Sequence, residues 1–118
     1  MPDPKEGARR KPATGISIND PAGFERFAVG LFEDNRLIMG FDAPPGTGDA
    51  RNRERITISA DAMGGAYIRF LNRKTLVPGL LQLGEDDRLY LDFLDVQPSK
   101  VIRRRIGFIG EQKIEEPR

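Results

Sequence analysis

Short apolar runs separated by turn residues recur along the whole chain, and the 3.6-residue period of an amphipathic helix is nearly absent. The spacing of these runs is typical of an all-β sandwich or barrel. We therefore predict a mainly antiparallel all-β domain, a small barrel or sandwich of about six to eight strands built from hairpins, in which one short helix could cover an open end. No internal sequence repeat is evident.

The clearest hairpin covers residues 24–42, where FERFAVGLF and LIMGFD flank EDNR. A tight turn at Asp34-Asn35 sets Phe32 opposite Leu37 and fixes the register of the two strands. In that register both faces of the hairpin are apolar. Such a hairpin needs cover on both sides, either at the centre of the sheet or in a contact with another subunit.

A second hairpin joins RITISA to AYIRFL through DAMGG. One face is predicted to be apolar, with the pairs Ile56–Phe70, Ile58–Ile68 and Ala60–Ala66. The other face is predicted to carry Thr57, Ser59, Tyr67 and Arg69. This alternation gives the hairpin an inside and an outside.

Two further strands, in LYLDFLDV and VIRRRI, are joined by the turn QPSK. The expected register places Asp92 opposite Arg105 and Leu94 opposite Arg103, while Arg104 lies on the other face. A solvated face with cross-strand ion pairs and a nucleic-acid-binding patch are both compatible with the three arginines.

The length of 118 residues and the net charge of +1 indicate one domain without a strong overall electrostatic bias. Residues 1–14 are predicted to be a flexible basic tail, since proline, glycine and alanine dominate around its charged residues. Residues 15–110 would form a single β domain. The polar residues 111–118 are expected to fray at the C-terminus.

The composition removes many kinds of chemistry. The chain contains no cysteine and no histidine, which excludes disulfides and thiolate metal sites and takes away the commonest general base. We therefore expect no enzyme, no catalytic residues, no metal site and no cofactor. No run of about 18 apolar residues and no secretory h-region is present, so we expect a cytoplasmic protein that does not enter a membrane.

The segment PPGTGD, residues 44–49, resembles a phosphate-binding loop only superficially. A P-loop needs the pattern G-x-x-x-x-G-K-[ST] between a strand and a helix. Here Ala43 replaces the first glycine, Asp49 the lysine and Ala50 the hydroxyl residue, and a strand follows. We therefore do not expect a nucleoside triphosphatase.

The segment that follows this loop is the best candidate for a binding site. Guanidinium groups form bidentate contacts with phosphate and with the guanine edge, and small residues let a ligand approach backbone N–H groups. The candidate ligand-binding residues are Arg51, Arg53, Arg55, Thr57, Ser59, Gly64, Gly65 and Arg69.

At these residues the chain resembles a known family. ITISADAMGGAYIRFL followed by LVPGLLQLGEDDRLYLDFL is similar to the core of a PilZ domain, in which R-x-x-x-R and [DN]-x-S-x-x-G segments on a six-stranded barrel bind cyclic di-GMP. Arg51 and Arg55 form the R-x-x-x-R pattern, and Ser59 matches the serine of the second segment. The resemblance implies a non-enzymatic receptor for a cyclic dinucleotide, or a degenerate relative that acts through protein contacts.

Two other functions stay open at this point. A nucleic-acid-binding barrel would use Arg51, Arg53 and Arg55 together with a basic patch. The residues of that alternative patch are Arg9, Arg10, Lys11, Lys100, Arg103 and Arg105. A structural or assembly protein would instead pack the hairpin 24–42 against another copy or a partner protein.

Overall fold

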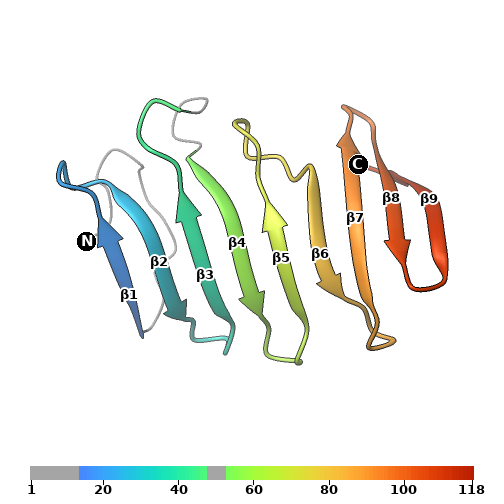
Figure 1. The fold of residues 1–118 in the computed structure, drawn as a ribbon, viewed down its shortest axis with the longest axis horizontal. Helices are drawn as coiled ribbons and strands as arrows, with labels where there is room; N and C mark the ends of the chain where they lie inside the picture. Colours follow the sequence, from blue (N-terminus) through green and yellow to red (C-terminus); the bar gives the residue numbers. More distant parts are fainter. Residues whose placement is uncertain (1–13, 48–52) are drawn as a thin grey trace.

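A computed structural model describes residues 14–47 and 53–118. These residues form one antiparallel sheet of nine strands, in which neighbouring strands follow the order of the chain (Figure 1). The strands are β1 (Thr14–Asn19), β2 (Glu25–Leu31), β3 (Leu37–Asp42), β4 (Glu54–Ala60), β5 (Ala66–Phe70), β6 (Gly79–Leu83), β7 (Leu89–Val96), β8 (Lys100–Gly107) and β9 (Gly110–Pro117). Within these two ranges there is no helix, and hence none that could span a membrane.

The predicted all-β, antiparallel class is confirmed, whereas the predicted barrel or sandwich of six to eight strands is wrong. The sheet is open, because β1 and β9 are its two edge strands and do not pair with each other. Each short connection places a strand beside the one before it, so no connection carries the chain across to a second sheet. The result is a single layer, although domains are normally built from at least two packed layers.

Five turns in the described part of the chain share one geometry. They cover residues 20–24, 32–36, 61–65, 72–76 and 84–88. In each turn, the N–H of the first residue donates to the carbonyl of the fifth residue, and the N–H of the fourth residue donates to the carbonyl of the first. The fourth residue has a positive φ. This is a structural repeat that the sequence did not reveal, because Gly23, Asn35, Gly64, Thr75 and Asp87 all occupy that fourth position.

The register predicted for the hairpin 24–42 is wrong by one residue. The turn has a three-residue loop in which Asn35 takes a φ of 69°, so Leu31 faces Leu37 and Val29 faces Met39. A shift of one residue moves every side chain to the other face of a strand. The large apolar side chains of β2 and β3, apart from Ile38, therefore share one face, and the other face is not a second apolar surface.

The other predicted registers are confirmed. Ile58 pairs with Ile68 in the second hairpin, Asp92 pairs with Arg105, and Leu94 pairs with Arg103.

The C-terminus differs from the prediction of a frayed tail, because residues 110–117 form β9 along the whole of β8. The polar residues of β9 lie beside basic residues of β8. The contacts Lys100–Glu115 at 3.8 Å and Arg104–Glu111 at 3.7 Å are examples. Of the tail predicted at residues 1–14, only Thr14 lies within the described residues, where it begins β1.

The two faces of the sheet differ in chemistry. One face, which we call the apolar face, has a central row that crosses β1 to β8 in register. This row consists of Ile16, Val29, Met39, Ile58, Ile68, Leu81, Leu91 and Ile106. The opposite face, which we call the polar face, carries Thr57, Ser59, Tyr67, Arg69, Gln82, Tyr90, Asp92, Arg103 and Arg105.

Burial is the reverse of what a globular core requires. Leu71 is the one buried apolar side chain among the described residues, with 7% of its surface exposed. The buried polar residues are Asp42, Arg53, Thr57, Ser59 and Asp92. The sheet therefore buries polar groups and leaves its apolar residues in contact with water.

Candidate functional site

The apolar face is a broad surface with no cover from the described residues. Beside the central row runs a second row of Ile18, Phe27, Phe41, Ile56, Phe70 and Phe93, interrupted by Gly79. Ile16 is 69% exposed, Phe70 49% and Phe93 51%, whereas such side chains are usually buried. Both rows end in charged residues on β9, because Glu111 and Lys113 continue them.

The size of this surface decides whether it is unusual. With strands about 4.8 Å apart, a row over eight strands is about 34 Å long, and strands of about six residues give a width of about 20 Å. The apolar face thus covers on the order of 700 Å², more than the largest apolar patch of a typical monomer, about 300–600 Å². A surface of this size is typical of an interaction site.

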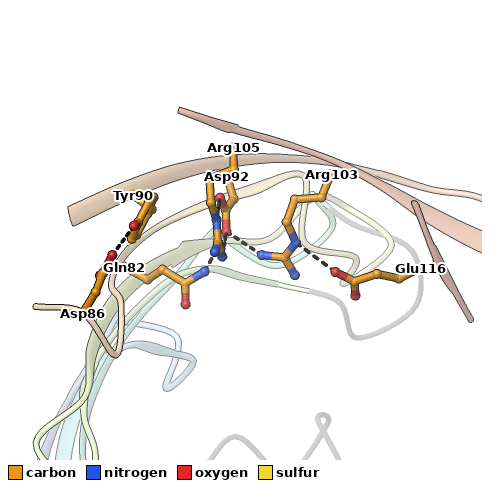
Figure 2. A network of polar contacts seen from close by, with 7 residues as sticks. All are labelled: Gln82, Asp86, Tyr90, Asp92, Arg103, Arg105 and Glu116. Carbon is orange, nitrogen blue, oxygen red and sulfur yellow. Dashed lines mark hydrogen bonds and ion pairs between the residues drawn. The ribbon is translucent and has the colours of Figure 1, made fainter. Parts of the chain in front are cut away.

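The polar face is organised around one buried carboxylate, that of Asp92, whose side chain is 0% exposed (Figure 2). Nε of Arg105 donates to Oδ1 at 2.8 Å, and its second terminal nitrogen donates to Oδ2 at 3.0 Å. The amide of Gln82 donates to Oδ2 at 2.6 Å, and Arg103 donates to the same oxygen. Arg103 also contacts Glu116 at 3.4 Å through Nε.

These contacts set the ionisation of Asp92. Burial is the largest single influence and opposes the charged form, but the hydrogen bonds from Arg105, Gln82 and Arg103 together outweigh it. They hold the pKa of Asp92 below its ordinary value of 3.8. The carboxylate is therefore ionised at neutral pH and accepts four hydrogen bonds from three side chains, so it is a structural anion and not a free general base.

A tyrosine lies beside this cluster. The hydroxyl of Tyr90 donates to Asp86, which lowers the pKa of that carboxyl and raises the pKa of Tyr90. The guanidinium of Arg105 lies 4.7 Å from the centre of the Tyr90 ring. Arg105 therefore links the buried carboxylate to the ring by an ion pair on one side and a cation–π contact on the other.

The arginines predicted to bind a ligand have other partners. Arg53 is 3% exposed, and it donates to the carbonyls of Glu25 at 3.1 Å and Ala43 at 3.0 Å. Arg55 donates to the carbonyl of Thr47 at 2.8 Å. Both side chains therefore bind backbone carbonyls in the described part of the β3–β4 connection, and Arg53 also binds β2.

Part of the predicted site does come together on the polar face. Thr57 pairs with Arg69 and Ser59 with Tyr67 across β4 and β5, while Gly64 and Gly65 lie in the turn beyond the strand ends. The remaining predicted residues are Arg51, Arg9, Arg10 and Lys11, which lie outside the described residues, and Lys100, Arg103 and Arg105, which pair with carboxylates.

Two polar atoms near β4 and β5 are buried without a hydrogen-bond partner, Oγ of Ser59 and Nε of Arg69. Ser59 is 5% exposed, and the guanidinium of Arg69 lies 5.6 Å from the centre of the Tyr67 ring. A buried polar group without a partner is unfavourable, so these two atoms are unsatisfied polar atoms within the polar face.

The sequence reasoning missed Gln82 and Tyr90. The register that placed Asp92 opposite Arg105 was available from the sequence, but the position of Gln82 depends on the pairing of β6 with β7. The turn between these two strands, residues 84–88, has a three-residue loop that was not predicted from the sequence.

A hollow of about 370 Å³ lies between the β4–β5 and β6–β7 turns. Its lining residues include Asp61, Met63, Glu85 and Asp87. Asp61 accepts hydrogen bonds from the N–H groups of Met63 and Gly65 within its own turn. In the described ranges, no cluster of three or more histidine, cysteine or carboxylate side chains is arranged to hold a metal ion.

No protein-family model, no curated protein and no solved structure matches this chain. The resemblance to PilZ domains therefore stays a prediction, and the arguments below rest on the two faces of the sheet.

Proposed function

We propose that the chain is a non-enzymatic assembly module, whose apolar face binds a second protein layer. The observation that supports this function is the continuous apolar surface over eight strands, of which the described residues cover nothing. Burial of apolar area is the dominant favourable contribution to association, so a sheet with an apolar face is stabilised when that face is covered.

The distribution of charge supports the same function. The two long rows of the apolar face carry no charged residue from β1 to β7, and the charged positions lie at one end, on Arg104, Glu111 and Lys113. Interfaces typically have an uncharged centre and a polar rim. The end formed by β8 and β9 fits such a rim.

The first test measures whether the apolar face is open in dilute solution. We expect a fluorescent dye that binds exposed apolar surface to bind the wild-type protein, and the double substitution of Leu91 and Phe93 by lysine to reduce the fluorescence several-fold. Met63→Lys is the matched control, because Met63 is 93% exposed in a turn outside the face. A wild-type protein that neither binds dye nor associates at any concentration would contradict the proposed function.

A second candidate function is that of a receptor for a phosphate-containing ligand on the polar face, with cyclic di-GMP as the ligand that the PilZ resemblance implies. The observation that favours it is the pair of buried atoms without partners, Oγ of Ser59 and Nε of Arg69. A phosphate oxygen could accept a hydrogen bond from both groups, since hydroxyl and guanidinium groups are donors.

Calorimetry with cyclic di-GMP tests the second candidate. We expect a binding heat with the wild-type protein, and an affinity at least about tenfold lower with Arg69→Ala, because a hydrogen bond to a charged group is worth about 1.5–3 kcal/mol. Arg104→Ala is the control, since Arg104 lies on the apolar face. Absence of heat with the wild-type protein would remove this candidate.

A further inference from the structure

We infer that the partner of the apolar face is a second copy of this chain, packed face to face so that two sheets form a β-sandwich. This inference rests on the proposed function and names the partner. Two sheets that pack in this way lie about 10 Å apart with their strand directions within about 30° of each other.

The dimensions of the apolar face favour a sheet as the partner. About 700 Å² is close to the roughly 800 Å² that each partner contributes to a standard stable interface. A helix is only about 10–12 Å wide including its side chains, so it would cover about half of a face that is about 20 Å wide. The same face of a second copy has the length, width and lack of charge that the surface requires.

The charges on β9 favour one symmetry. If the two-fold axis runs along the strands between β4 and β5, then β1 lies over β8 of the other copy and β4 lies over β5. Strand β9 has no counterpart in this arrangement, so Glu111, Lys113 and Glu115 remain in water. An axis perpendicular to the strands would place β9 over β9 of the other copy and bring the two Lys113 side chains close together. Repulsion between these like charges disfavours that arrangement.

This symmetry also superimposes the central row on itself. Ile16 at one end of the row meets Ile106 of the other copy, and Ile58 on β4 meets Ile68 on β5. A two-fold interface requires such self-complementarity, because the same surface of both subunits forms the contact.

The first measurement is the mass in solution by analytical ultracentrifugation. We expect a species of twice the 13.2 kDa of one chain, and an at least tenfold weaker association for Leu91→Lys, whose side chain is part of the central row. Met63→Lys is expected to associate as the wild type does, and circular dichroism checks that each variant is folded. A dimer that Leu91→Lys does not weaken would overturn the inference.

A wild-type protein that stays monomeric up to about 200 μM would also overturn the inference. The dye then separates the two proposals. Dye binding by that monomer would leave the assembly module standing with a different partner, whereas no dye binding would remove both.

The second measurement tests the symmetry and leaves the interface intact. The chain has no cysteine, so Met63→Cys and Ile109→Cys each provide a single site for a spin label. The two residues lie in the β4–β5 and β8–β9 turns, which are at the same end of the strands (Figure 1). Met63 lies in the turn next to the proposed axis, and Ile109 lies four strand spacings away from it. We expect a distance of about 15 Å or less between the two Met63 labels and of about 40 Å between the two Ile109 labels. Equal distances, or a longer one at Met63, would overturn this symmetry.

Discussion

Replacement of Asp92 by alanine is expected to lower the free energy of unfolding by about 3 kcal/mol, because it leaves two guanidinium groups close together without their shared anion. The Asp92 side chain is 0% exposed, and Arg103 and Arg105 both donate to it. Removal of one partner from a buried ion pair typically costs about 3–5 kcal/mol. The lower end applies here, since the arginine side chains keep 20% and 27% of their surface in water.

Urea unfolding of the wild type and of Asp92→Ala at one protein concentration measures this loss. Asp95→Ala is the matched control, because Asp95 is an exposed carboxylate on the same strand, with a hydrogen bond from Gln97. We expect Asp95→Ala to change the free energy of unfolding by less than about 0.5 kcal/mol. Similar losses in both variants would show that Asp92 is not the centre of the cluster.

The pH dependence of stability provides an independent check on Asp92. Its pKa in the folded protein lies below the value of about 3.9 expected in the unfolded chain. The stabilisation is therefore complete above about pH 4 and is lost as the pH falls through the folded pKa. Asp92→Asn, which has a similar shape, is expected to lack this part of the pH dependence. Asp86 has a lowered pKa as well, but it is present in both proteins, so the difference between the two curves reports Asp92.

The sequence predicted the register of two of the three hairpins it identified, because the alternation of side chains constrains pairing locally. Thr57 and Ser59 were placed on the face of Tyr67 and Arg69, and the structure confirms these positions. The ion pair between Asp92 and Arg105 also followed from the register, because a four-residue turn leaves little freedom.

The hairpin 24–42 shows where this reasoning fails. Asn35 adopts a positive φ, which only a few residue types do easily, and it extends the turn to a three-residue loop. The sequence EDNR is compatible with a two-residue and a three-residue turn, and the difference of one residue exchanges the two faces. The number of layers could not be predicted either, since it depends on whether a connection carries the chain to a second sheet.

The arginines of the predicted site show a different limit. Arg53 and Arg55 have the chemistry of a phosphate site, but whether a guanidinium meets a ligand or a carbonyl depends on the path of the loop before β4. In the structure the carbonyls of Ala43 and Thr47 are close enough to accept their hydrogen bonds. Residue type alone does not distinguish these two uses.

Gly107→Ala is expected to lower the free energy of unfolding by about 1–3 kcal/mol, because the added methyl group would overlap the Tyr90 ring. A Cβ at residue 107 would lie 2.7 Å from two carbons of that ring, Cδ1 and Cε1. The ring has little room to move away. The ring is also close to Gly84, where a Cβ would lie 2.7 Å from Cε2 of the ring. The Tyr90 hydroxyl donates to Asp86, and the Arg105 guanidinium lies 4.7 Å from the ring centre, so both contacts hold the ring in position.

Urea unfolding of the single and double variants separates the ring from the strand backbone. In a Tyr90→Ala background, Gly107→Ala is expected to cost less than about 0.5 kcal/mol, since the ring carbons it would overlap are absent, and the non-additivity measures the contact. Gly40→Ala is the matched strand control, because its Cβ would find its nearest neighbour, Oε1 of Glu54, at 3.4 Å. Equal costs for Gly107→Ala with and without the Tyr90 ring would show that the strand geometry, and not the ring, requires glycine at this position.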